Sequence, residues 1–291
     1  MRFFHYLLCF ALVPSFVSAQ DRPLPDRPAF LAEVRARLDR DEDRQAGYSY
    51  VETRKRFTLD GSGRVRDESR RVLESYPGLP GEPRWERVLE EEGAQTSAAN
   101  LARTDAARQK KAEQFARKMA KQSDGDRRRA RQEAEQDRRE TAARVDDVFQ
   151  VYDLQLVGRE TIDGHDTIVV SMNPRPDARP RTREGGWLRR FRGRAWVSET
   201  DFELVKLDVE AIQDVRLGLG LVGRIYRGTT FAFGRRKVNG DRWLPAFSTY
   251  TVSGRLLLLK RLRERGTTEY SNYRQFAVNT TSTIAPPPDT K

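Results

Sequence analysis

Apolar and polar residues alternate along most of the second half of the chain. Within residues 202–211, Val205, Leu207 and Val209 alternate with charged residues. Such a period of two is typical of a strand with one buried side and one solvent-facing side. The same pattern predicts further strands at 151–162, 166–172, 192–199, 228–237, 242–258 and 262–277.

Glycine-containing turn signals separate these alternating segments. Asp163-Gly164 and Asn239-Gly240 are typical of two-residue hairpin turns. In the first half of the chain, Asp60-Gly61-Ser62-Gly63 separates two further alternating segments. The strands predicted there are 47–59, 64–76 and 83–91.

Two regions have a helical pattern instead. Residues 28–44 carry one apolar stripe, formed by Phe30, Leu31, Val34 and Leu38. Residues 94–147 are rich in charged residues and alanine, and Ser123-Asp124-Gly125-Asp126 interrupts them. This predicts two helices whose apolar stripe is too thin for a buried position, so we expect a solvated helical insertion. The alternative is an arm that binds a partner or a membrane surface.

The fold class that these elements predict is α+β. We expect a large curled antiparallel sheet of about nine to eleven strands, an incomplete β-barrel, with helices covering its concave face and the charged helical hairpin inserted. Such a sheet encloses an apolar trough, which either side chains or a ligand can fill. The residues expected to line it are Phe30, Leu31, Val34, Leu38, Trp196, Val205, Leu207, Phe231 and Trp243.

A glycine-rich apolar segment, 213–226, is predicted to be a short helix or a mobile segment, and its part 215–226 is the candidate for a lid over this trough. Its lid residues would be Leu217, Leu219, Leu221 and Val222. The segment also contains a G-x-G-x-x-G match that starts at Gly218. That match lacks the strand and turn of a dinucleotide site, so we interpret it as chance.

The first nineteen residues predict a cleavable signal peptide. Arg2 precedes the apolar stretch 3–13, and Val17-Ser18-Ala19 is a small-residue cleavage pattern. The apolar stretch is shorter than the roughly 20 residues that span a bilayer. Cys9, the single cysteine, lies inside this stretch, so no lipobox is predicted. The remainder, 20–291, is expected to be one exported, soluble domain with a disordered tail at 280–291.

The chemistry available to the exported chain is narrow. The formal charge of the full sequence is +11, and removing Arg2 with the leader lowers it to +10. This charge favours anionic partners, and export argues against nucleic acid. His165 is the only histidine outside the leader, which leaves no histidine or cysteine cluster for a metal and no Ser-His-Asp set. We therefore predict no catalytic residue, no cofactor, no metal and no enzymatic activity.

An arginine-rich loop at 174–194 is the second charged feature. It contains eight arginines and two acids, interleaved with Trp187, Leu188 and Phe191. Such a loop could contact lipid phosphates at an envelope surface, and a solvated loop is an equal alternative. The residues that would make this contact are Arg189, Arg190 and Arg192.

Several tracts of the second half resemble a known family. They are Gly158-Arg-Glu-Thr-Ile-Asp-Gly164, Ile168-Val-Val-Ser-Met-Asn-Pro174, the tract from Arg194 through Trp196 to Leu207, Trp243-Leu-Pro245 and Tyr270-Ser-Asn-Tyr-Arg-Gln-Phe276. Their order resembles the outer-membrane lipoprotein-sorting superfamily of the LolA/LolB type. The resemblance implies a periplasmic location and an incomplete β-barrel closed by helices, with an apolar cavity for acyl chains. The charged insertion and the missing lipobox depart from that pattern.

The function predicted from these observations is a periplasmic carrier that holds a lipid or acylated ligand, such as a lipoprotein acyl chain, in the apolar trough. The alternative is a sensor or scaffold on the same fold. It would bind a protein or membrane-surface partner through the helical insertion and the arginine-rich loop, and its trough would be filled by its own side chains.

Overall fold

The computed structural model describes residues 22–38, 47–79, 83–217, 222–256 and 260–275. The predicted signal peptide and the tail at 280–291 lie outside the described residues. The helices are α1 (Arg27–Leu38), α3 (Ala98–Ala120), α4 (Asp124–Val151) and α5 (Arg183–Leu188). The strands are β1 (Tyr48–Leu59), β2 (Val65–Tyr76), β3 (Trp85–Glu91), β4 (Ala94–Gln95), β5 (Tyr152–Ile162), β6 (His165–Pro174), β7 (Phe191–Ser198), β8 (Leu204–Ala211), β9 (Val215–Leu217), β10 (Gly223–Ile225), β11 (Thr230–Val238), β12 (Arg242–Leu256) and β13 (Lys260–Gln275).

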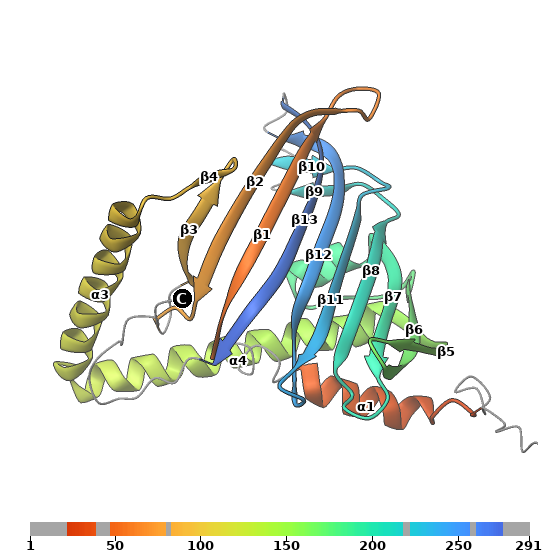
Figure 1. Ribbon diagram of the computed structural model, residues 1–291. Coiled ribbons are helices and arrows are strands. Elements are labelled where there is room, and N and C mark those ends of the chain that lie inside the picture. The colour runs from red at the N-terminus through yellow and green to blue at the C-terminus, as the bar shows by residue number, and fades with distance from the viewer. Residues whose placement is uncertain (1–21, 39–46, 80–82, 218–221, 257–259, 276–291) are drawn as a thin grey trace, which may run out of the picture.

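The strands form one antiparallel sheet in the order β4-β3-β2-β1-β13-β12-β11-β8-β7-β6-β5 (Figure 1). The first described strand, β1, therefore lies next to the last described strand, β13. The two strands pair from Tyr48↔Gln275 to Thr58↔Glu264. Within the described residues β4 and β5 end the order without pairing with each other. The predicted class, α+β with a large open antiparallel sheet, is confirmed.

The sheet has 13 strands rather than nine to eleven, because short strands join it at positions that the sequence did not mark. For the segment 213–226 a short helix was one of the two expected conformations, and this expectation is wrong for its described part. Val215–Leu217 and Gly223–Ile225 form a hairpin, and the second strand pairs with β12 at Gly223↔Leu256. A strand partner far away in the sequence decides the conformation here, and local glycine content does not.

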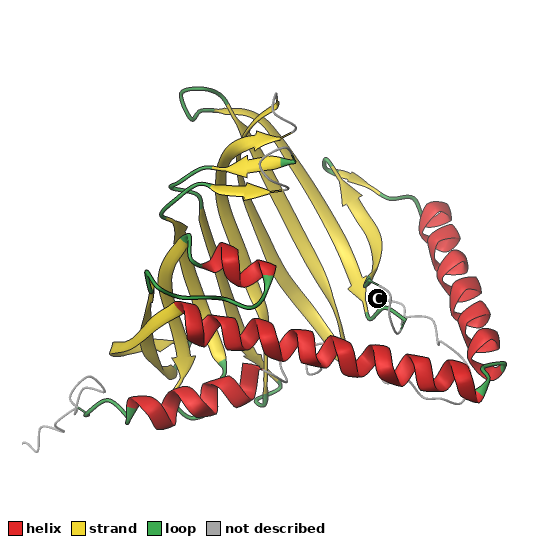
Figure 2. Ribbon diagram, turned by 180° about the vertical axis from the view of Figure 1, so that it is seen from behind, coloured by secondary structure: helices red, strands yellow, loops and turns green. Residues whose placement is uncertain are grey.

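The core lies between the sheet and three helices. Figure 2 shows α1, α4 and α5 on the same side of the sheet. Phe30 and Val34 of α1, together with Val151 at the end of α4, are buried against strands β5–β8. Fully burying each such side chain contributes about 1.5–3 kcal/mol relative to exposure. Helix α1 ends at Leu38, and the rest of the predicted helix, 39–44, lies outside the described residues.

The charged region 94–147 forms two helices, as predicted. Ser123 caps α4 in a reciprocal pair of hydrogen bonds with Asp126, which starts the second helix, and the first helix ends at its C-cap, Lys121. The two helices diverge from this junction, and α3 lies beyond the β3–β4 end of the sheet (Figure 1). Among its described contacts, α3 is held by an ion pair between Asp105 and Arg87 of β3, at 3.0 Å. Helix α4 continues past the predicted boundary of 147 into the core.

Candidate functional site

An apolar cavity of about 440 Å³ lies between the sheet and the three helices. Its floor comes from neighbouring strands in register. Val170 of β6 pairs with Ala195 of β7, and Ala195 pairs with Leu207 of β8. Directly paired residues point to the same face of a sheet, so these side chains form one continuous apolar row under the cavity.

The roof comes from helices whose apolar residues recur at helical spacing. Leu31, Val34 and Leu38 of α1 lie at intervals of three and four residues, which places them on one face. Val148 and Phe149 extend the roof from the last turn of α4. The described residues that line the cavity are Leu31, Val34, Leu38, Val148, Phe149, Tyr152, Leu154, Val170, Met172, Leu188, Phe191, Ala195, Val197, Leu204, Leu207, Val209 and Phe231.

None of the described lining residues is charged. Its one side-chain hydroxyl, that of Tyr152, donates a hydrogen bond to the backbone carbonyl of Leu188 at 2.9 Å. Burial raises the pKa of Tyr152 to about 12, so the hydroxyl stays neutral at physiological pH. The cavity therefore offers apolar surface and no group that would stabilise a charge or activate water.

A buried carboxylate holds α5 over the cavity. Asp147 of α4 has no exposed surface, and its carboxylate accepts hydrogen bonds from the backbone N–H groups of Arg181 and Thr182, each at 2.7 Å. The Thr182 hydroxyl also donates to it and accepts from the N–H of Gly185. Burial raises the pKa of Asp147, but these hydrogen bonds outweigh it, and the pKa lies below its ordinary value. A side chain at Gly185 would overlap this carboxylate, because a Cβ there would lie 2.2 Å from Oδ2 of Asp147.

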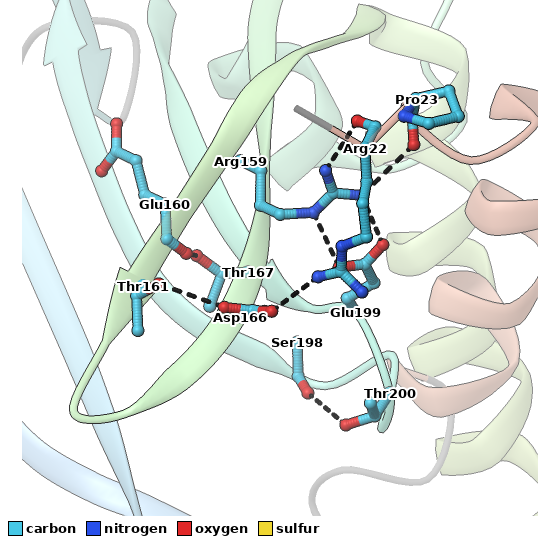
Figure 3. Close-up of polar contacts among 10 residues, drawn as sticks. All are labelled: Arg22, Pro23, Arg159, Glu160, Thr161, Asp166, Thr167, Ser198, Glu199 and Thr200. Atoms are coloured by element: carbon cyan, nitrogen blue, oxygen red, sulfur yellow. Dashed lines mark hydrogen bonds and ion pairs between the residues drawn. The ribbon is translucent and has the colours of Figure 1, made fainter. Parts of the chain in front are cut away.

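The segment before α1 is fixed by a second buried charge (Figure 3). Arg159 of β5 forms a two-pronged ion pair with Glu199, at 2.6 and 2.8 Å. The same guanidinium donates to the backbone carbonyls of Arg22 at 2.9 Å and Pro23 at 3.3 Å. The Arg22 side chain in turn pairs with Asp166 at 2.7 Å. These contacts fix where α1 begins and thereby hold its apolar face over the strands.

The cavity opens at Phe231 of β11. This residue is 39% exposed, which is more than any other described lining residue. Beyond it the sheet continues through β12, β13, β1 and β2. Figure 2 shows no helix lying over the upper part of these strands.

The structure separates the residues that the sequence proposed as ligand-lining. Five of them line the cavity: Leu31, Val34, Leu38, Leu207 and Phe231. The other four, Phe30, Trp196, Val205 and Trp243, lie outside the lining. Phe30 packs on the ring of Phe202, with 5.5 Å between centroids.

Trp196 and Trp243 are placed by polar partners. The indole N–H of Trp196 donates to Glu160 at 2.7 Å, and that of Trp243 donates to Asp201 at 2.8 Å. Val205 is the extra residue of a β-bulge. Trp196 pairs with Lys206, whereas Val197 pairs with Leu204, so Val205 has no partner of its own on β7. Strict alternation would place Val205 on the cavity face with Leu207, and the bulge breaks that alternation.

Val222 is the one proposed lid residue whose side chain the structure describes, and it lies outside the described lining of the cavity. Val222 is 56% exposed. Leu217 ends β9, and its side chain is not among those described. Leu219 and Leu221 lie outside the described residues.

The three arginines proposed to contact an anionic surface each have a partner within the protein. Arg189 donates to the carbonyl of Pro176 at 2.9 Å, Arg190 to the carbonyl of Asp214 at 2.9 Å, and Arg192 to the carboxylate of Glu210 at 3.1 Å. These contacts fasten the arginine-rich loop to neighbouring elements. A role at an anionic surface stays a prediction.

Sequence reasoning did not identify several lining residues. Val148 and Phe149 lie in the last turn of a long polar helix, and the low apolar content of that helix hides them. Val170 and Met172 belong to a predicted strand whose period of two could have assigned them to one face. Leu188 belongs to the arginine-rich loop, which was expected to be irregular but contains α5.

Among the described residues, no cluster of three or more His, Cys, Asp or Glu side chains is arranged to hold a metal ion. None of the helices in these segments combines the length and apolar character that crossing a bilayer requires.

Comparison with known proteins gives matches only among solved structures. No protein-family model and no curated protein matches the sequence. The LolA superfamily protein NE2245 from Nitrosomonas europaea is similar over 86% of this chain and 94% of its own, with 12% identity and a TM-score of 0.33. A domain from Vibrio parahaemolyticus assigned to outer-membrane lipoprotein sorting is similar over 88% and 93%, with 11% identity and a TM-score of 0.33. A DUF1329 family protein from Desulfovibrio piger is similar over 87% and 93%, with 15% identity and a TM-score of 0.29.

The solved structures to which this chain is similar thus include proteins of the family that its sequence resembles. At TM-scores this low the likeness carries no argument of its own. The function is therefore inferred from the strand pairing and from the composition of the cavity.

Proposed function

We propose that this protein is an exported binding protein that carries a lipid or an acylated ligand in the cavity between α1, α4, α5 and the sheet. The observation that carries the proposal is the composition of the lining, which is apolar throughout except for one hydroxyl already engaged by a backbone carbonyl. The volume of about 440 Å³ lies within the range of about 300–1,000 Å³ that is typical of small-molecule sites.

Burial of an acyl chain supplies enough free energy for such a function. Each buried methylene contributes about 0.8 kcal/mol, so a chain of about sixteen carbons gains on the order of 12 kcal/mol before other terms. Association costs an estimated 4–15 kcal/mol or more, and burial of the acyl chain supplies most of the free energy that offsets this cost. Useful affinity therefore requires no catalytic group and no metal.

The alternative function, a sensor or scaffold that does not carry a ligand, predicts a trough filled by the protein's own side chains. The volume of the cavity favours the carrier. The diverging helices α3 and α4 are the surfaces that a protein partner would use, because α3 has no buried residue in the described structure.

The proposal is tested by native mass spectrometry of the protein purified from its own cells, followed by lipid extraction. We expect co-purifying acyl lipid or acylated peptide, and we expect Phe231→Glu to lose it because the carboxylate would stand at the opening. The matched control is Val157→Glu, since Val157 is 54% exposed on β5 and outside the lining. A ligand-free protein that also fails to bind a fluorescent fatty acid would exclude the carrier.

A further inference from the structure

A row of directly paired residues leads away from the cavity opening. Phe231 pairs with Tyr250 of β12, Tyr250 with Gly266 of β13, and Gly266 with Arg56 of β1. Because directly paired residues share one face of an antiparallel sheet, these four positions lie on the face that carries the cavity. We call these four positions the rim row. It spans three strand spacings, or about 14 Å.

A contact between β1 and β13 identifies the residues that lie on the opposite face of the sheet. The guanidinium of Arg265 lies 4.9 Å from the ring centroid of Phe57, so these two residues share one face. Successive residues of a strand point to opposite faces. Arg56 and Gly266 therefore belong to the other face, which is the face of Phe231.

The glycine of the rim row lets the tyrosine ring lie across β13. A Cβ at Gly266 would lie 2.3 Å from Cε1 of Tyr250 and 2.7 Å from its hydroxyl oxygen. The ring thus covers Gly266, and its hydroxyl end stands over the strand between β12 and Arg56. Burial raises the pKa of Tyr250, the Glu264 carboxylate raises it further and Arg56 lowers it, with a net rise. The hydroxyl therefore stays protonated and can donate a hydrogen bond.

Arg56 differs from the other arginines on this face of the sheet. Arg54 forms ion pairs with Glu52 and Glu86, each at 2.6 Å. Arg56 is exposed, and within the described residues no hydrogen bond or ion pair of its side chain is present. Glu264, the acid of β13 on this face, pairs with Thr58 and lies two residues along the strand from Gly266, where its charge acts on Tyr250.

We infer that the rim row is a headgroup site and that the ligand is an anionic amphiphile. Its acyl chain would enter the cavity past Phe231, and its phosphate or carboxylate would accept hydrogen bonds from the Arg56 guanidinium and the Tyr250 hydroxyl. A guanidinium and a phenol hydroxyl are strong donors to such an anion, and charge-assisted hydrogen bonds are about twice as strong as neutral ones. This inference rests on the proposed function, because the chain of the ligand must occupy the cavity.

Two probes that differ by one phosphate test the inference. Palmitoyl lysophosphatidic acid and monopalmitoylglycerol share the same acyl chain, and their affinities for the purified, delipidated protein are measured by displacement of a fluorescent fatty acid. We expect a preference of about tenfold for the phosphate-bearing probe. Arg56→Gln should remove that preference and leave the affinity for monopalmitoylglycerol unchanged. Tyr250→Phe should reduce the preference, since it keeps the ring and loses only the hydroxyl.

Lys55→Gln is the matched control, because Lys55 is the adjacent exposed cation on the opposite face of β1. It should keep the full preference, which separates a specific contact from a general effect of net charge. Inorganic phosphate alone is the third probe. If it binds at Arg56 as tightly as the lipid does, the site recognises free anions and the headgroup assignment is overturned.

The outcomes separate this inference from the proposed function. Equal affinity for the two lipid probes overturns the headgroup site while the carrier function stands. Failure to bind either probe overturns both. Loss of the preference in Lys55→Gln as well as in Arg56→Gln would assign it to net charge and would overturn the role of the rim row.

Discussion

The carboxylate of Asp147 accepts a hydrogen bond from the backbone N–H of Thr182 at 2.7 Å, which joins the end of α4 to the start of α5. Thr182 is the N-cap residue of α5, so the same pair of residues both starts this short helix and attaches it over the cavity. A helix of six residues has little stability of its own. The placement of Leu188 in the roof therefore depends on this contact.

Asp147→Asn should destabilise the protein by about 3 kcal/mol, because a hydrogen bond to a buried charge contributes about 1.5–3 kcal/mol and the amide would direct a donor at another donor. Urea unfolding followed by circular dichroism measures this change. Asp146→Asn is the control, since Asp146 is part-exposed and pairs with Arg35 of α1 near the surface. A surface pair contributes about 0–1 kcal/mol. Equal losses in the two variants would contradict the role assigned to Asp147.

Stability should fall in acid through the carboxyl groups whose pKa values are lowered in the folded protein. Hydrogen bonds and charge from Arg159 hold the pKa of Glu199 below its ordinary value of 4.5, and the pKa of Asp147 lies below 3.8. The unfolded chain therefore binds protons more readily than the folded one at these groups. Their contribution is complete above the ordinary values and is lost as the pH falls through the lower folded values.

The measurement is urea unfolding at several pH values between about pH 6 and about pH 3. We expect the midpoint to change little at the upper end of this interval and to decrease once the pH falls below the ordinary values of 4.5 and 3.8. Glu199→Gln should show a smaller decrease than the unmodified protein, because one of the linked groups is absent. A midpoint that rises as the pH falls would contradict the assignment.

Loss of Arg159 should release the segment before α1. Its side chain is 3% exposed and contacts the Arg22 and Pro23 carbonyls as well as Glu199, so Arg159→Gln leaves several buried acceptors with fewer donors. We expect faster amide hydrogen exchange in peptides that cover α1 and weaker ligand binding, because α1 supplies three lining residues. Arg22→Gln is the control, since the Arg22 side chain is 54% exposed. Unchanged exchange in α1 would show that the segment is held by other contacts.

The sequence predicted the strands well where one face is buried and one is solvated. The predicted strands 47–59 and 64–76 begin within one residue of β1 and β2, because alternation and the intervening turn residues are local signals. The same alternation failed at Val205. A β-bulge depends on the partner strand, and the partner strand is unknown from one sequence.

A site residue could be predicted only where the helix or strand that carries it was predicted correctly. The helical stripe of α1 gave Leu31, Val34 and Leu38 directly. Phe149 was missed because the low apolar content of its long polar helix concealed it, and its burial depends on how far α4 extends over the sheet. Arg56 carries no signal at all in the sequence, since only the register of β1 with β13 connects it to the cavity.

Filling the cavity should separate ligand binding from stability. Ala195 lies on the floor between Val170 and Leu207, and it is 9% exposed. Ala195→Leu adds apolar volume inside the space that the acyl chain would occupy, so affinity for a fluorescent fatty acid should fall at least tenfold. Because the added carbons meet apolar neighbours, the thermal midpoint should stay the same or rise, as is common for substitutions that fill a cavity. Ala211→Leu is the comparison, since Ala211 is fully buried outside the lining and overpacking there should lower the midpoint. Unchanged affinity in a stably folded Ala195→Leu protein would place the ligand elsewhere.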